Sequence, residues 1–225
     1  MKKSSTQMSN SYLTYLRVKR AIYLFLKRVN DIVVSLIGLV LLIPITIIIK
    51  IAYMCTGDFH KIIFTQDRIG RNGKLFKFYK FRSMVPNADE VLFKALAEDE
   101  ELAEEYHKNK KLKNDPRITK VGKWIRKASI DETPQFINIF LGDMTLIGNR
   151  PYLPREKKDM GDSFNEIVRT KPGLTGYWQT SGRSDLSFKK RLELETYYSI
   201  HSGFKMDIKI FFKTFIVVIN GRGAD

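Results

Sequence analysis

Two adjacent carboxylates, Asp131 and Glu132, are the side chains in this sequence that are best placed to do chemistry. Pro134 and the helically spaced apolar residues after it predict a helix, with Asp131 as its N-cap and Glu132 as its first residue. Free backbone N–H groups and the helix dipole would keep a carboxylate ionised there, and they could also bind a phosphate. The pair is therefore either an ordinary helix cap or a nucleophile beside an anion site.

The composition indicates an anionic partner. Among 225 residues, 39 are Lys or Arg and 24 are Asp or Glu, which gives a formal net charge of +15. Such an excess favours binding to nucleic acid, acidic lipid headgroups or phosphorylated substrates. The single cysteine excludes an internal disulfide and a cysteine-rich metal site, and the three scattered histidines do not form a His-x-x-x-His site.

Two loops have the composition of ligand-binding segments. Residues 148–154 carry Arg150 between two prolines and a glycine, which predicts a rigid, extended backbone. A guanidinium fork matches the oxygens of a phosphate, so this loop is a candidate phosphate clamp. Residues 171–184 alternate glycines with hydroxyls, aromatics and Arg183. The second loop has neither the Walker nor the dinucleotide-binding spacing.

The elements that must position these residues are mostly helical. Residues 62–84 predict a β-hairpin with a tight turn at Asn72-Gly73, and its second strand places Lys80 and Arg82 among aromatics. Basic residues between aromatics also suit nucleic-acid binding. We predict helices over 88–111, 119–127 and 155–169, and an amphipathic helix over 206–219 that either packs on the domain or lies on a membrane.

The most apolar segment, residues 32–49, carries no charge and has the threshold length for a membrane span. Basic residues flank it on both sides, and basic flanks prefer the cytoplasmic face. Pro44 lies inside the segment and is expected to bend it. We therefore favour a re-entrant membrane helix over a straight span, and either of them over a buried core helix. The basic residues before it form either a disordered tail or a lead that lies on the membrane surface.

Five motifs occur in one order: Lys80-Phe-Arg-Ser-Met84, Asp131-Glu-Thr-Pro-Gln135, Gly142-Asp-Met144, Asn149-Arg-Pro151 and Pro172-Gly-Leu-Thr-Gly-Tyr-Trp-Gln-Thr-Ser-Gly-Arg183. Together they resemble the bacterial sugar transferases, the monotopic polyprenyl-phosphate phosphoglycosyl transferases. The resemblance runs from about Lys27 to the C-terminus. Asn149 stands where that family usually has the first proline of Pro-Arg-Pro, and Ile43 precedes Pro44 where the family often has serine.

The resemblance implies an α+β, mostly helical fold. Its parts are a basic lead over 1–26, a re-entrant membrane helix over 27–55 kinked at Pro44, and a catalytic domain over 56–225 with a small β-hairpin and amphipathic interfacial helices. The implied location is the inner (cytoplasmic) membrane, with the catalytic domain on its cytosolic face. The family's larger members carry extra N-terminal membrane helices, so we expect this chain to be the minimal catalytic form.

The implied activity is the transfer of a sugar 1-phosphate from a UDP-sugar to undecaprenyl or another polyprenyl phosphate, with release of UMP. This would be the first membrane step of exopolysaccharide or capsule synthesis. Asp131 would be the nucleophile that carries the phosphosugar, and it could also bind Mg²⁺, the family's cofactor; Glu132 would be its partner or proton handler. Arg126 and Arg150 are the main expected phosphate contacts, and Lys80, Arg82 and Arg183 are weaker candidates.

Other functions remain open at this stage. A membrane-tethered basic module that binds nucleic acid or acidic lipid without catalysis is the alternative from another class, although we expect no nucleic-acid partner. A hydrolase of nucleotide-sugars is the alternative among enzymes. Galactose and glucose suit a polysaccharide-initiating enzyme, but no motif identifies the sugar, and the oligomeric state is equally open.

Overall fold

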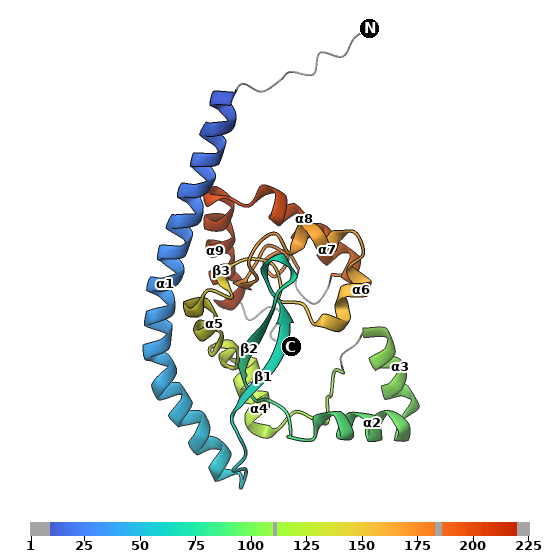
Figure 1. Cartoon of the computed structure of the whole chain (residues 1–225). Helices are drawn as coiled ribbons and strands as arrows, with labels where there is room; N and C mark the ends of the chain where they lie inside the picture. Colours follow the sequence, from blue (N-terminus) through green and yellow to red (C-terminus); the bar gives the residue numbers. More distant parts are fainter. Residues whose placement is uncertain (1–9, 110–111, 183–185, 220–225) are drawn as a thin grey trace.

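A single long helix, α1 (Asn10–Cys55), runs along one side of the protein, and every other element lies to one side of it (Figure 1). The computed structural model describes residues 10–109, 112–182 and 186–219. Within them, α1 is the one helix that is long and apolar enough to cross a membrane. Its apolar side chains are largely exposed, which is unusual for a helix packed in a core.

Helix α1 continues through Pro44 without a break, so the structure shows a bowed helix and no helix–turn–helix hairpin at this point (Figure 1). Proline removes one main-chain donor from the helix. The Thr46 hydroxyl donates to the carbonyl of Leu42 at 2.7 Å within the same turn. The helix also begins well before residue 27, at Asn10. The basic lead is therefore helical from Asn10 on, which differs from the disordered-tail alternative.

The β-hairpin predicted over 62–84 is confirmed. Strands β1 (Ile63–Ile69) and β2 (Leu75–Phe81) pair antiparallel, and a short 3-10 turn, η1 (Arg71–Gly73), joins them. Asn72 and Gly73 both have positive φ, 58° and 77°. Asparagine and glycine are the residues that tolerate this conformation best, which is why the pair marks the turn.

The charged helix predicted over 88–111 is two helices, α2 (Ala88–Glu98) and α3 (Glu100–Asn109). Asp99 between them is extended, and its carboxylate accepts a hydrogen bond from the N–H of Leu102 at 2.9 Å. Asp99 therefore acts as the N-cap of α3, and α2 ends before it. The basic helix α4 (Lys120–Lys127) is confirmed, with Thr119 as its N-cap.

The helix predicted to start at Asp131 begins later. Asp131 and Glu132 lie in a 3-10 turn, η2 (Ile130–Glu132), and α5 (Gln135–Leu141) follows. Pro134 lacks the N–H that a continuous α-helix would use, and tighter i→i+3 bonds bridge this stretch instead. The N-cap assignment of Asp131 was therefore wrong. Helix α5 packs on α1, where an added Cβ at Gly38 would come within 2.5 Å of the Phe136 ring.

A second small sheet was not predicted. Strand β3 (Thr145–Ile147) pairs in parallel with β4 (Gly173–Thr175), and a bridge between Asn149 and Pro172 extends the contact. Between the strands lie η3 (Pro154–Glu156), α6 (Lys157–Met160) and α7 (Ser163–Ile167). The helix predicted over 155–169 is thus broken, because Gly161 has a positive φ of 51°.

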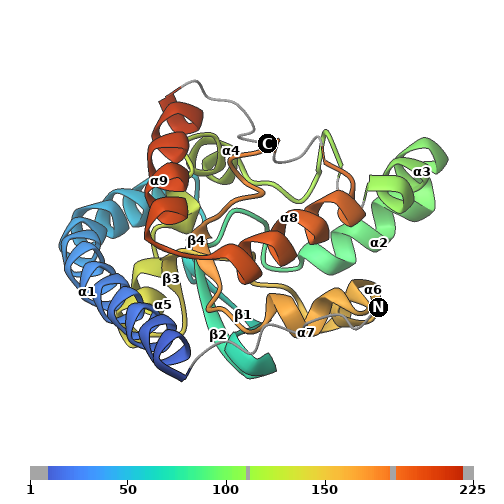
Figure 2. The same cartoon turned by 90° about the horizontal axis from the view of Figure 1, so that it is seen from above.

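Two further helices, α8 (Phe188–His201) and α9 (Phe204–Ile219), complete the fold, and α9 lies close to α1 (Figure 2). The C-terminal amphipathic helix is confirmed by α9. It packs on the domain through buried Ile210 and through Thr214, whose hydroxyl pairs with that of Thr175 at 2.9 Å. Its other face exposes apolar side chains, namely Phe211, Phe212, Phe215 and Ile216. The fold is α+β and mostly helical, as predicted.

Candidate functional site

A cavity of about 650 Å³ contains the Asp131–Glu132 pair. It lies between α1, β2, α5 and α9. Six charged side chains line it, together with apolar side chains from α1 and α9. Its charged lining residues are Arg68, Lys80, Arg126, Asp131, Glu132 and Arg150. Val34 of α1 and Phe211 and Phe215 of α9 also line it. A polar, charged floor therefore adjoins an apolar wall.

The two carboxylates differ in their exposure. The side chain of Asp131 is 12% exposed and that of Glu132 is 41% exposed. The turn that carries them starts at Ser129, which adopts a left-handed conformation with φ of 54°. This conformation is uncommon for a residue other than glycine and ends helix α4 sharply. It turns Asp131 inward and leaves Glu132 at the mouth of the cavity.

Lys80 joins the pair from strand β2. Its ammonium Nζ lies 2.8 Å from Glu132 Oε1 and 3.4 Å from Asp131 Oδ2. Lys80 was expected as a weaker candidate for a phosphate contact, and the structure places it against the two carboxylates. Neighbouring Tyr79 is held in place because Asn138 of α5 accepts from its N–H at 3.1 Å and donates to the carbonyl of Lys77 at 2.6 Å. These two bonds fix β2 against α5, and with it the position of Lys80.

Burial raises the pKa of the Asp131 carboxyl above its usual value, and the nearby charge of Lys80 counteracts this. The negative charge of Glu132 adds to the increase. This differs from the expectation that a helix start would hold Asp131 ionised, because α5 begins only at Gln135. The cations Lys80 and then Arg126, rather than a helix start, favour the carboxylate form.

Arg126 and Arg150, the two main expected phosphate contacts, both line this cavity. The loop of Arg150 is held from two sides. The N–H of Arg150 donates to Oε1 of the buried Glu195 at 2.8 Å. The amide of Asn149 donates to Ser199 Oγ at 2.7 Å and to the carbonyl of Ile167 at 3.1 Å. Asn149 stands where the bacterial sugar transferases usually have a proline. Its hydrogen bonds hold the loop in place.

Arg68 is a site residue that the sequence analysis missed. It projects from β1, donates to the carbonyl of Pro151 at 3.0 Å and lines the same cavity as Arg150. Burial, and then the charge of Arg150, lowers the pKa of its guanidinium to about 10. A desolvated arginine beside a second arginine is stabilised by a bound anion. Arg68 pairs with Phe76 across the hairpin, and its guanidinium lies over the Phe78 ring. The alternation of side chains along the hairpin could therefore have indicated that Arg68 points inward.

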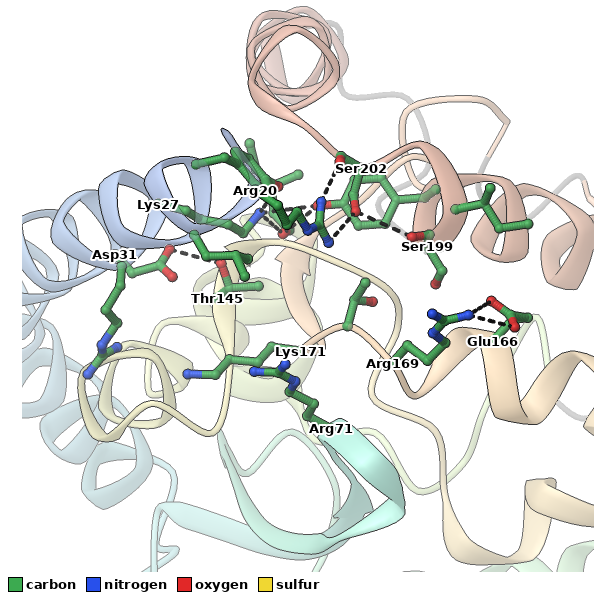
Figure 3. A pocket seen from close by; sticks show the side chains of 17 residues that line it. Arg20, Lys27, Asp31, Arg71, Thr145, Glu166, Arg169, Lys171, Ser199 and Ser202 are labelled. Carbon is green, nitrogen blue, oxygen red and sulfur yellow. Dashed lines mark hydrogen bonds and ion pairs between the residues drawn. The ribbon is translucent and has the colours of Figure 1, made fainter. Parts of the chain in front are cut away.

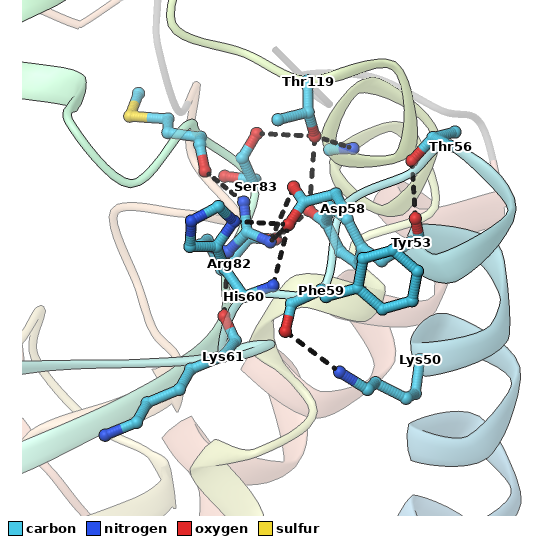
Figure 4. Close-up of polar contacts among 12 residues, drawn as sticks. Lys50, Tyr53, Thr56, Asp58, Phe59, His60, Lys61, Arg82, Ser83 and Thr119 are labelled. Carbon is cyan, nitrogen blue, oxygen red and sulfur yellow. Dashed lines mark hydrogen bonds and ion pairs between the residues drawn. The ribbon is translucent and has the colours of Figure 1, made fainter.

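Arg82 does not reach the cavity. Its guanidinium makes two bonds of 2.9 Å to the Asp58 carboxylate and also donates to the carbonyls of Lys61 and Met84 (Figure 4). Tyr53 of α1 donates to the main-chain carbonyl of Arg82. This group anchors the end of α1 to the hairpin, so the assignment of Arg82 as a phosphate contact is corrected to a structural role. Arg183 lies outside the described residues.

The site offers two carboxylates to a metal ion, Asp131 and Glu132. Within the described residues, no group of three or more His, Cys, Asp or Glu side chains could hold a metal by itself. Mg²⁺ is usually bound by one or two protein carboxylates and by substrate phosphates, and a dedicated protein cage is not needed. The donor set therefore fits Mg²⁺ that arrives with a phosphorylated ligand, and it does not fit a permanently bound ion.

Comparison with known proteins identifies the family of the chain. Residues 22–221 match the family model described as bacterial sugar transferase. Over 200 residues the chain is 45% identical to the "undecaprenyl-phosphate galactose phosphotransferase" of Salmonella typhimurium, an overlap that covers 89% of this chain and 42% of that protein.

Two further relatives differ in length. The "galactosyl transferase CpsE" of Streptococcus agalactiae is 39% identical over 225 residues, which covers 99% of this chain and 49% of the relative. The "exopolysaccharide production protein ExoY" of Sinorhizobium fredii is 36% identical over 198 residues, or 88% of this chain and 87% of the relative. The chain thus spans less than half of the first two relatives and most of the third.

Proposed function

This chain belongs to the bacterial sugar transferase family, and from that premise we propose that it transfers a hexose 1-phosphate from a UDP-sugar to undecaprenyl phosphate. The products are UMP and a polyprenyl-diphosphate-sugar that starts an exopolysaccharide or capsule. One observation carries the proposal: the Asp131 carboxylate lies in a cavity that also holds three arginines and apolar side chains of α1 and α9. The cavity matches a substrate that is anionic at one end and apolar at the other.

The reaction proceeds in two displacements at one phosphorus atom. An Asp131 carboxylate oxygen attacks the β-phosphorus of the UDP-sugar, the bond from that phosphorus to the UMP oxygen breaks, and UMP leaves. A phosphate oxygen of the polyprenyl phosphate then attacks the same phosphorus, and the bond to Asp131 breaks. Splitting a difficult transfer in this way is the usual benefit of a covalent intermediate. The carboxylate is restored at the end of each cycle.

The remaining charged residues support these steps. Lys80 contacts both carboxylates, at 3.4 Å and 2.8 Å, and keeps Asp131 in its nucleophilic form. Arg68, Arg126 and Arg150 line the space in which a diphosphate would lie. Their guanidinium groups would offset its negative charge and that of the departing UMP. Glu132 is the partner carboxylate, exposed enough to exchange a proton with water.

We propose Mg²⁺ as the cofactor, which Asp131 and Glu132 would hold. The ion would neutralise charge on the diphosphate. In this structure Lys80 contacts both carboxylates. Once an ion occupied the carboxylates, the Lys80 ammonium would move toward a substrate phosphate.

The same proposal places the catalytic domain on the cytosolic face of the inner membrane. The exposed apolar side chains of α1 and the exposed face of α9 would lie in or on the bilayer, which brings the cavity to the depth of the lipid phosphate. Basic flanks on both sides of residues 32–49 favour a helix that enters and leaves by one face. Because α1 is only bowed and stays helical through Pro44, this arrangement needs a sharper bend there in the bilayer, and an interfacial α9 would support it.

The test is an intact-mass measurement of the purified chain mixed with UDP-sugars and Mg²⁺ but without a lipid acceptor. We expect a phosphosugar adduct from one donor, with UDP-galactose and UDP-glucose tested first. Asp131→Asn should abolish the adduct, whereas the matched exposed control Asp159→Asn should keep it. Added undecaprenyl phosphate should then discharge the adduct.

Two outcomes would replace the proposal. Release of sugar phosphate into water in the absence of lipid, at the rate seen in its presence, would assign a nucleotide-sugar hydrolase. Absence of any adduct or turnover, together with nucleic-acid binding that persists at high salt, would assign a basic binding module.

A further inference from the structure

A second cavity, of about 780 Å³, is lined by Thr145 of strand β3 (Figure 3), whereas the next residue, Leu146, lines the cavity of Asp131. The second cavity shares Ile147 alone with the cavity of Asp131. Its walls come from the first half of α1, the hairpin tip, the segment after α7 and the end of α8. No residue of the proposed transfer reaction lines it, so it needs a separate explanation.

The charges in this second cavity do not balance. Lys27 pairs with Asp207, and Arg169 pairs with Glu166. Four more cations line the cavity without a carboxylate partner among the described residues, namely Arg20, Arg28, Arg71 and Lys171. The remaining carboxylate, Asp31, accepts from the Thr145 hydroxyl at 3.0 Å and from the N–H of Leu146 at 2.9 Å. Four cations therefore face one carboxylate that is already hydrogen-bonded to β3.

Lys171 and Arg28, which both line this cavity, come close together beside Gly142. A Cβ added at Gly142 would lie 3.4 Å from both Arg28 Nη2 and Lys171 Nζ. The guanidinium of Arg28 donates to the carbonyls of Ile139 and Phe140 in the last turn of α5, at 2.6 Å and 2.7 Å, and pairs with no carboxylate among the described residues. Burial lowers the pKa of Lys171, and the charges of Arg28 and Arg71 act in the same direction. An anion between these groups would remove that repulsion.

The place of the cavity along α1 indicates the source of such an anion. Its α1 residues, from Arg20 to Asp31, occupy the turns just before the uncharged segment 32–49. If that segment is inserted in the bilayer, the cavity lies at headgroup depth. Exposed Leu24 and Ile200 at its rim offer apolar contact for an acyl chain. Phosphate groups at this depth belong mainly to membrane lipids.

We propose that this cavity binds the phosphate-bearing headgroup of an anionic membrane lipid, with Lys171 and Arg71 as its main contacts. The inference rests on the membrane insertion of α1 but not on the transferase reaction. A bound lipid would fix α1 against the hairpin tip and α8, three elements that the unbalanced charges otherwise push apart. The cavity is then a lipid site separate from the substrate cavity.

The test is native mass spectrometry of the full chain in a neutral detergent, titrated with phosphatidylglycerol or with phosphatidylcholine of the same chain length. We expect one phosphatidylglycerol to bind saturably and phosphatidylcholine to bind weakly. Arg71→Ala with Lys171→Ala should weaken phosphatidylglycerol binding by about tenfold for each cation removed. The double control Lys123→Ala with Lys158→Ala removes the same charge from exposed positions outside the cavity and should bind as the wild type does.

Further measurements keep the proposal falsifiable if the double variant fails to fold. A photoreactive phosphatidylglycerol on the wild-type chain should label α1 between Arg20 and Asp31, or the segment around Lys171, and labelling only at α9 would overturn the proposal. Equal binding of phosphatidylcholine would also overturn it. Inorganic phosphate that displaces the lipid and is itself lost in the double variant would assign a free-phosphate site instead.

The two proposals can fail separately. Asp131→Asn should bind phosphatidylglycerol as the wild type does, whatever its effect on the phosphosugar adduct.

Discussion

The ammonium group of Lys80 lies 3.4 Å from Asp131 Oδ2, although 51 residues separate the two in the sequence. The same ammonium contacts Glu132 at 2.8 Å. Asp131 is mostly buried, and burial alone would favour its protonated form. Lys80 is therefore the main cation that favours the ionised form of this buried carboxylate.

We expect Lys80→Met to move the acid limb of the pH profile for adduct formation to higher pH. Lys80 lowers the pKa of Asp131, so its removal raises that pKa and the carboxylate forms only at higher pH. The measurement is the initial rate of phosphosugar-adduct formation between pH 5 and 9. Lys77→Met is the control, since Lys77 lies on the same strand but pairs with Asp67. An unshifted profile in Lys80→Met would refute this role.

Glu195 should make the protein less stable as the pH rises toward neutrality. Burial raises the pKa of this carboxyl from 4.5 to about 7, although Arg150 and Arg191 oppose the increase. The folded chain then holds a proton that the unfolded chain has released, so the free energy of unfolding falls from about pH 4.5 to about pH 7. Glu195→Gln keeps an oxygen acceptor for the N–H of Arg150 and should flatten this dependence, measured by urea unfolding.

The control for that experiment is Glu193→Gln, on the same helix but paired with Lys190 at the surface. It should leave the slope of stability against pH unchanged. If Glu195→Gln keeps the wild-type slope of stability against pH, groups other than Glu195 cause the pH dependence.

Arg82→Met and Arg126→Met should have opposite consequences. Arg82 satisfies the Asp58 carboxylate and two carbonyls in a partly buried group, and its loss should lower the free energy of unfolding by about 1–3 kcal/mol. The adduct should still form in the fraction that stays folded. Arg126→Met should leave thermal unfolding nearly unchanged and slow adduct formation. The reverse pattern would return Arg82 to the phosphate site.

Gly122→Ala should destabilise the protein even though alanine favours helix by about 1 kcal/mol. A Cβ at Gly122 would lie 1.9 Å from the carbonyl oxygen of Ser83, which is backbone and cannot move aside easily. Overpacking of this kind costs about 1–3 kcal/mol. Thermal unfolding of Gly203→Ala is the control, because its nearest neighbour would be the carbonyl oxygen of His201 at 3.9 Å. A higher melting temperature in Gly122→Ala would contradict the close packing of α4 on Ser83, which follows strand β2.

The residues near one another in the sequence were sufficient to predict several parts of this protein. Asn72-Gly73 indicated the hairpin turn, the basic helix was expected over 119–127, and the periodicity of residues 206–219 indicated α9. These signals are local, because backbone conformation and helix capping depend on immediate neighbours. Breaks within helices were missed at Asp99 and Gly161, where one residue stops a pattern that its neighbours would continue.

The sequence by itself also determined the chemistry that is present: an adjacent carboxylate pair, an excess of cations and an apolar segment beside them. The tertiary structure decided which cations meet the carboxylates. Lys80 reaches Asp131, Arg68 joins Arg150, and Arg82, two residues from Lys80, turns away to Asp58. A charged residue carries no mark of its partner in the sequence, because its interactions depend on which distant elements pack around it.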